Sequence, residues 1–178
     1  MNTTVQVFVK WIDVPIKAWA YISAADCDDW EHIGGPSNPE TNGRYGLSAS
    51  AVRILVVEDF EPFLQFISST LGNRRDLQVI GEVFDGLEAV QQAVELKPDL
   101  ILMDIGLPSL NGIEAARQIR KLVPESKIIF FSQEYFADVV QEALSLGAWG
   151  YVVKTSAGTD LLAAVDSVIL GKRFVSST

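Results

Sequence analysis

The sequence lacks the features that mark disulfide-linked, secreted and membrane-spanning proteins. Its 178 residues include one cysteine, Cys27, which excludes an internal disulfide and agrees with a reducing compartment. No apolar run reaches the roughly 18 residues that a membrane helix needs. Lys10, Asp13 and Lys17 interrupt the first twenty positions, where a signal peptide would need an unbroken apolar stretch. We therefore expect a cytoplasmic protein that has no membrane partner.

Basic residues are scarce as well. The chain has 14 lysines and arginines against 23 aspartates and glutamates, which gives a formal net charge of -9 at pH 7. This balance provides no basic stripe that would attract nucleic-acid phosphates, so we expect that the chain does not bind nucleic acid. Hydrophobic residues are abundant, at 48%, which is enough to bury the core of one domain with an appendage.

The first 50 residues differ in composition from the rest. They hold three of the four tryptophans, and they run into the breaker-rich segment "GGPSNPETNGRYGLSAS", which is typical of a loop or a disordered linker. We predict an irregular or disordered extension over residues 1–50 and a folded domain over residues 51–178. Two explanations of the extension stay open: a translation start placed upstream of the true one, which we favour, and a partner-binding segment that uses exposed tryptophans.

From residue 52 onward, five apolar stretches with the character of strands alternate with five helical patterns. Strands are predicted at 52–57, 77–83, 99–103, 127–131 and 150–153, and helices from near Pro62 to near Gly72 and at 86–97, 112–122, 136–146 and 158–170. The second helix is expected to place Leu87, Val90 and Val94 on one apolar face, with Ala93 as a further candidate. The alternation predicts an α/β fold, a doubly wound five-stranded parallel sheet of the flavodoxin-like type with strand order 2-1-3-4-5.

Five polar side chains follow predicted strands directly. Glu58 and Asp59 come after the first strand, Asp104 after the third, Ser132 after the fourth and Lys154 after the fifth. In open parallel sheets the ligand site lies at this edge, at the switch point between the first and third strands. Each residue alone has an ordinary explanation, such as a carboxylate at a helix start, a helix cap or an exposed lysine. Their convergence on one edge favours a functional site.

Four segments resemble the receiver domain of two-component response regulators, most closely the type that usually precedes a LuxR-type helix-turn-helix domain. They are "ILVVEDFEPF", "PDLILMDIGLPSLNGIEAARQIR", "IIFFS" and "GAWGYVVKTSAGTDLLAAVDSVILGKRFVS". They follow the order and spacing of the family over residues 52–176. The resemblance implies a phosphorelay protein, not an enzyme for outside substrates, which accepts phosphate from a sensor histidine kinase or a histidine phosphotransfer protein.

The resemblance also implies a metal site and a phosphorylation site. It assigns Asp104 as the phospho-acceptor, and Glu58, Asp59, Asp104 and the backbone carbonyl of Gly106 as ligands of Mg²⁺. The chemistry of these residues agrees, because clustered oxygen ligands suit Mg²⁺. Three carboxylates close together also need a cation to neutralise them.

The remaining implied roles concern the phosphoryl group and the switch. Lys154 and Ser132 would contact the phosphoryl oxygens, and Tyr151 would follow Ser132 inward, which changes a surface that binds a second copy of the chain or a downstream protein. Two residues depart from the common family pattern. Gln133 stands where a small residue often follows the hydroxyl residue, and Thr155 replaces the proline that commonly follows the lysine.

Three alternatives compete with this interpretation. After Gly171 only "KRFVSST" remains, so we expect a stand-alone receiver, and a truncated DNA-binding transcriptional regulator is the alternative. A phosphatase of the haloacid dehalogenase type would need a second aspartate two residues after the nucleophile, where this chain has Gly106. A flavodoxin-like electron carrier would need a hydroxyl-rich phosphate loop after the first strand, where this chain has the acidic segment "EDFEPF".

Overall fold

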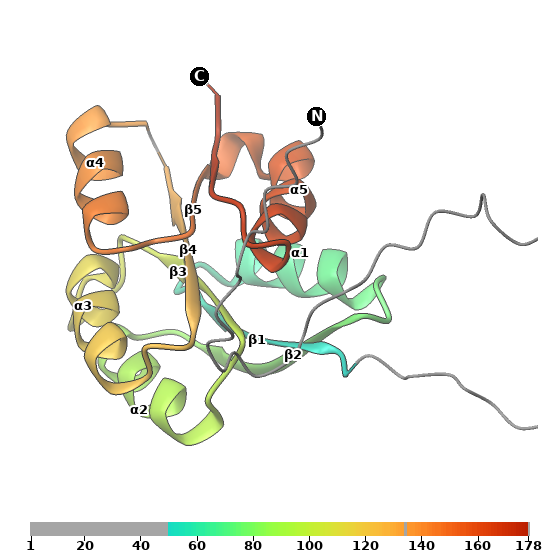
Figure 1. Cartoon of the computed structure of the whole chain (residues 1–178), viewed down its shortest axis with the longest axis horizontal. Coiled ribbons are helices and arrows are strands. Elements are labelled where there is room, and N and C mark those ends of the chain that lie inside the picture. Colours follow the sequence, from blue (N-terminus) through green and yellow to red (C-terminus); the bar gives the residue numbers. More distant parts are fainter. Residues whose placement is uncertain (1–49, 134, 178) are drawn as a thin grey trace, which may run out of the picture. The chain divides into compact units, whose positions relative to one another are not determined.

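Strands and helices alternate strictly in the computed structural model of the protein, which describes residues 50–133 and 135–177 (Figure 1). The elements are β1 (Val52–Val57), α1 (Glu61–Gly72), β2 (Leu77–Val83), α2 (Gly86–Leu96), β3 (Leu100–Asp104), α3 (Gly112–Leu122), β4 (Lys127–Ser132), α4 (Ala137–Ser145), β5 (Gly150–Val153), a 3₁₀ turn η1 (Lys154–Ser156), α5 (Ala157–Ile169) and β6 (Phe174–Val175). No helix in these ranges is long and apolar enough to cross a membrane.

The strands form one parallel sheet with the order β2-β1-β3-β4-β5-β6. The predicted flavodoxin-like topology is confirmed, but the sheet has six strands where five were predicted. The sixth strand holds only Phe174 and Val175, which pair with Gly150 and Tyr151 of β5. Two residues are too few to show a strand period in a sequence, so only the backbone hydrogen bonds reveal β6.

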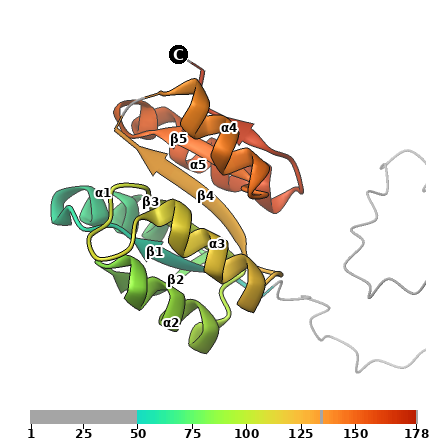
Figure 2. The same cartoon turned by 90° about the vertical axis from the view of Figure 1, so that its left-hand side faces the viewer.

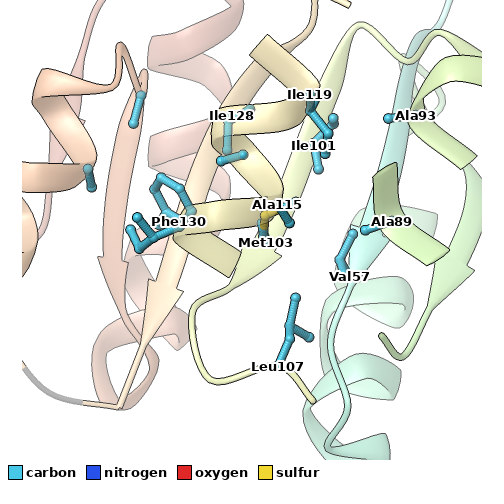
Figure 3. Close-up of a cluster of buried hydrophobic side chains, with 14 of the residues drawn as sticks. Val57, Ala89, Ala93, Ile101, Met103, Leu107, Ala115, Ile119, Ile128 and Phe130 are labelled. Carbon is cyan, nitrogen blue, oxygen red and sulfur yellow. The ribbon is translucent and has the colours of Figure 1, made fainter. Parts of the chain in front are cut away.

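Helices cover both faces of the sheet, and each face has its own apolar core. Alternate residues of the strands point to opposite faces, so that Ile54 and Val56 of β1 pack against α1 and α5, while Leu55 and Val57 face α2 and α3. Figure 2 looks onto the second face, where α2, α3 and α4 lie in front of the strands. Figure 3 shows part of this core around Met103.

Helix α2 packs differently from the prediction. Leu87 and Val94 are 51% and 43% exposed, whereas Val90 and the further candidate Ala93 of the predicted face pack in the core. The fully buried positions of α2 are Ala93 and Ala89, and Ala89 was not predicted. Short side chains let α2 lie close to α3 and to the sheet, so close approach decides which face of this helix is buried.

Candidate functional site

The carboxyl edge of the sheet brings the predicted polar residues together. β3 and β4 each extend one residue further than predicted. Asp104 and Ser132 are therefore the last residues of these strands and do not follow them. Glu58 and Asp59 follow β1, and Lys154 follows β5. The ammonium of Lys154 lies 2.7 Å from Glu58 Oε1 and 3.1 Å from Asp104 Oδ2. The ends of three strands therefore meet in one ionic cluster.

Glu58 is the most buried member of this cluster, with 1% of its surface exposed. Its backbone N–H donates to Val83 O, and its Oε1 accepts hydrogen bonds from Lys154 Nζ and from the N–H of Phe60. Burial raises the pKa of Glu58, the charge of Asp104 raises it further, and the Lys154 hydrogen bond opposes both. Its Oε2 is buried and has no hydrogen-bond partner among the described residues. A buried carboxylate oxygen without a partner is costly, so this atom is suited to a ligand.

Three carboxylates of the cluster fit a divalent cation. Oxygen atoms of Glu58, Asp59 and Asp104 all lie within 4.8 Å of one another. Asp59 is exposed while the other two are buried, so the group opens to solvent on one side. Gly106 lies beside it, since a Cβ built on Gly106 would be 3.5 Å from Asp104 Oδ2. An all-oxygen donor set that leaves room for water is the kind of site that Mg²⁺ prefers.

Lys154 is held by contacts that the sequence did not reveal. Its side chain is only 7% exposed, and its ammonium lies 4.9 Å from the centroid of the Phe63 ring. An aromatic face attracts a cation, and the ring also excludes water from one side of the ammonium. Phe63 and the N–H of Phe60 therefore belong to the site, although neither residue was predicted from the sequence to be part of it.

The loop after Asp104 is fixed by the start of α2 and by close backbone contacts. Asp85 accepts hydrogen bonds from Leu87 N and Glu88 N, and a hydrogen bond from Ser109 lowers its pKa. A Cβ on Gly86 would approach Leu110 O to 1.8 Å. The β2–α2 turn and the β3–α3 loop therefore support each other, and this contact holds the segment that contains Gly106.

Ser132 and Tyr151 connect the site to the outer part of the sheet. Burial is the main reason that the pKa of Tyr151 is raised, and hydrogen bonding by the Ser132 side chain opposes this rise. Tyr151 is fully buried, and its ring packs edge-on against Tyr135 at a centroid distance of 6.4 Å. Ser132 and Tyr151 are therefore neighbours, with the tyrosine inside the core, and their role as a switch pair stays a prediction.

Gln133 stands at the mouth of the site. It lines a hollow of about 190 Å³ together with Phe60, Phe63, Lys154 and Thr155. The peptide bond between Lys154 and Thr155 is trans, since no cis bond occurs at residues 50–133 and 135–177. The two residues that depart from the common family pattern therefore share the entrance to the ionic cluster.

Comparison with known proteins identifies the family. The family model of the response regulator receiver domain matches residues 54–166. This match spans more than half of the chain, so the protein belongs to the response regulator receiver family of two-component systems. Phosphorylation and Mg²⁺ binding are typical of this family.

Relatives of known name support this assignment. The chain is 36% identical to the response regulator protein VraR of Staphylococcus epidermidis over 122 residues, and 37% identical to VraR of Staphylococcus aureus over 121 residues. In both cases the alignment covers 68% of this chain and 58% of the relative. The chain thus matches little more than half of each relative's length.

Solved structures confirm the fold. A two-component response regulator of the LuxR family from Aurantimonas sp. SI85-9A1 matches with a TM-score of 0.67 and 31% identity, over 70% of this chain and 89% of that one. The signal receiver domain of the response regulator NarL from Mycobacterium tuberculosis matches with a TM-score of 0.65 and 27% identity, over 69% and 99%.

Proposed function

We propose that the protein is a phosphorelay receiver that accepts a phosphoryl group on Asp104. The observation that carries this proposal is the cluster in which the Lys154 ammonium contacts Glu58 and Asp104 while Asp59 opens to solvent. The phosphate donor would be a sensor histidine kinase or a histidine phosphotransfer protein in the cytoplasm. The chain would transfer phosphate to itself and then lose it, without acting on other substrates.

The transfer uses one carboxylate as nucleophile. A carboxylate oxygen of Asp104 attacks the phosphorus of a phosphohistidine, the new O–P bond forms as the P–N bond breaks, and the imidazole leaves with the electron pair of that bond. Lys154 stabilises negative charge on the phosphoryl oxygens, and Ser132 donates a hydrogen bond to one of them. A Mg²⁺ ion held by Glu58, Asp59, Asp104 and the Gly106 carbonyl supplies further positive charge when bound.

The output would be a change in the surface around α4, β5 and α5. Ser132 exchanges its hydrogen bond with Tyr151 for one with the phosphoryl group, which shifts the contacts of Tyr151 with Tyr135 at the start of α4. Such a local change biases a two-state surface. The surface would bind a second copy of the chain or a downstream protein, and we propose that the chain works as a stand-alone receiver.

A second candidate function follows from the relatives. Because the chain matches only 58% of VraR and is similar to a response regulator of the LuxR family, it is also proposed as the receiver part of a DNA-binding regulator. The nucleotide sequence downstream of codon 178 separates the two candidates. A helix-turn-helix encoded there in another frame would favour the regulator, and its absence would favour the stand-alone receiver.

The direct test of the proposed function is phosphorylation by a small donor. The purified chain is incubated with acetyl phosphate and Mg²⁺, and the intact mass is followed over time. We expect the mass of one phosphoryl group to be added, and we expect chelation of Mg²⁺ to prevent the addition. A chain that never gains this mass would disprove the proposal.

Asp59→Asn is expected to weaken Mg²⁺ binding without harming the fold. Asp59 is exposed, so its neutralisation removes one ligand charge but breaks no buried contact. We expect the dissociation constant for Mg²⁺, measured by calorimetry, to rise roughly tenfold or more, since ligand charge sets cation affinity. The melting temperature without Mg²⁺ should not fall. Unchanged Mg²⁺ affinity would remove Asp59 from the ligand set.

Gln133→Ala is expected to change the lifetime of the phosphorylated state more than its rate of formation. Gln133 and Lys154 line the same hollow, so the Gln133 amide stands where water would approach a phosphoryl group on Asp104. The rate of loss of the phosphoryl mass after removal of the donor measures this effect, and Gln133→Glu provides a control of similar size. Equal decay rates for wild type and Gln133→Ala would contradict the prediction.

We also propose that residues 51–178 form the receiver domain on their own. The sheet and both apolar cores of the described chain are built from residues 52–175, which include six strands and every helix that covers them. A fragment that starts at Ala51 is therefore expected to keep the melting temperature and the phosphorylation rate of the full chain. A large loss of stability in the fragment would show that residues 1–50 belong to the fold.

A further inference from the structure

Ser176 fastens the C-terminal end of the described chain to the strand that leads to Lys154. It is 2% exposed, although it lies only two residues from the end of the sequence. Its N–H donates to Tyr151 O over 2.9 Å, its hydroxyl oxygen accepts from Val153 N over 3.2 Å, and the hydroxyl donates to Asp160 Oδ2 over 2.6 Å. One side chain therefore joins the end of β5, the first turn of α5 and the tail.

The hydroxyl of Ser176 extends the β5–β6 hydrogen-bond ladder at the C-terminal end of β5. The ladder begins with Phe174 N donating to Trp149 O and continues with Ser176 N donating to Tyr151 O. The next hydrogen bond is made by a side chain, because Val153 N donates to Ser176 Oγ. A hydroxyl has one hydrogen and two lone pairs. Since its hydrogen is given to Asp160, a lone pair is left for the N–H of Val153.

Asp160 fixes the direction of this hydroxyl. Its Oδ2 accepts from Ser176, and its Oδ1 accepts from the hydroxyl of Thr159 over 2.9 Å. Asp160 lies in the first turn of α5, so it is anchored by the helix that follows the 3₁₀ turn η1. The carboxylate thus holds the Ser176 hydroxyl in the orientation that the Val153 bond needs.

These contacts hold the chain on both sides of the short turn that contains Lys154. Val153 directly precedes Lys154, η1 covers residues 154–156, and Asp160 follows in α5. We propose that Ser176 is a positioning residue for Lys154: by holding Val153 before the turn and Asp160 after it, Ser176 sets the Lys154 ammonium against Asp104. This inference rests on the proposed phosphorylation of Asp104, and it adds that the segment around Ser176 supports that reaction.

The predicted effect of Ser176→Ala is selective. The variant loses the acceptor for Val153 N–H and the donor to Asp160, so the turn loosens and Lys154 is held less firmly against Asp104. We expect the initial rate of phosphorylation by acetyl phosphate at saturating Mg²⁺ to fall roughly five- to tenfold, the size that one lost hydrogen bond produces. Mg²⁺ binding itself should persist, because Glu58, Asp59 and Asp104 lie at the ends of β1 and β3, outside the segment that Ser176 holds.

Two variants of Asp160 provide a matched pair. Asp160→Ala removes the acceptor that orients the Ser176 hydroxyl, so it is expected to reproduce the rate loss of Ser176→Ala. Asp160→Asn keeps an oxygen acceptor at the same place and is expected to stay near the wild-type rate. Because Asp160 is only partly buried, this pair remains informative even if Ser176→Ala does not fold.

The deciding experiment measures Lys154 directly and does not depend on phosphorylation. Wild type, Ser176→Ala and both Asp160 variants are treated with an amine-acylating reagent, and peptide mass mapping gives the reaction rate of each lysine. We expect faster reaction of Lys154 in Ser176→Ala and Asp160→Ala. Lys127 is the internal control, because its ammonium bonds Val168 O near the far end of α5 over 2.7 Å and should react at the wild-type rate.

The outcomes separate this inference from the proposed function. Unchanged reactivity of Lys154 in both variants, or an equal increase at Lys127, would overturn the positioning role and leave Ser176 as a general packing residue. A wild-type chain that is not phosphorylated, but whose Lys154 becomes more reactive in Ser176→Ala, would remove the proposed function while the coupling between tail and lysine remains.

Discussion

Replacing Asp104 by asparagine is expected to abolish phosphorylation of the chain by acetyl phosphate. A neutral amide cannot form the acyl phosphate that a carboxylate forms, and Glu58, the other carboxylate in contact with Lys154, is the most buried member of the cluster. The fold should survive, because the amide has the same size and Lys154 keeps its contact with Glu58 at 2.7 Å. The charge of Asp104 contributes to the raised pKa of Glu58, so its removal relieves repulsion inside the site.

The control for this variant is Asp138→Asn. Asp138 is an exposed carboxylate in the first turn of α4, away from the ionic cluster, and its replacement is expected to leave labelling at the wild-type level. Intact mass after incubation with donor and Mg²⁺ measures both variants, and thermal unfolding checks that both are folded. Full labelling of Asp104→Asn would show that another residue accepts the phosphoryl group. Peptide mapping would then identify that residue.

The sequence was sufficient to predict five of the six strands, their parallel order and the polar residues at the carboxyl edge of the sheet. Strand character and alternation with helices fix the parallel topology, and the topology then fixes which ends meet. Asp104 and Lys154 are separated by 50 positions along the chain and are nevertheless 3.1 Å apart, as their places after two strands predicted. The prediction of this contact depends on the regular alternation of strands and helices from residue 52 onward.

Contacts made by apolar groups and by the backbone could not be predicted in the same way. Phe63 has the pattern of a core residue, and only its position over the Lys154 ammonium shows its second role. Glu58 and Asp59 are neighbours in sequence, but one is buried and the other exposed, because successive side chains leave the strand end in different directions. The local sequence therefore identifies the two carboxylates but does not show which of them is buried and which is exposed.

Small residues explain why the buried face of α2 was predicted only in part. Its larger side chains Leu87 and Val94 are exposed, whereas Ala89 and Ala93 are buried because the helix approaches its neighbours closely. Glycines at the site follow the same rule. Gly112 is the first residue of α3 and lies against the backbone of Asp104. A Cβ added to Gly112 would lie 2.0 Å from Asp104 O and 3.0 Å from Asp104 C.

Gly112→Ala is therefore expected to destabilise the protein strongly. The atoms that a Cβ would meet are backbone atoms of β3, which cannot move aside as the end of a flexible side chain can. The N–H of Gly112 also donates to Ile105 O over 3.0 Å, so a shift of the helix start would break this bond. We expect the free energy of unfolding, measured in urea, to fall by about 3 kcal/mol or more, at the upper end of the cost of overpacking.

Gly158→Ala provides the matched control for this prediction. Gly158 lies in the first turn of α5 and is exposed, and a Cβ added there would meet no atom within 4 Å. Alanine should therefore leave stability unchanged or raise it by up to about 1 kcal/mol. Equal stability of Gly112→Ala and wild type would mean that β3 and α3 can separate without cost. The carbonyl of Asp104 would then not be held by the start of α3, and the placement of Asp104 would need another cause.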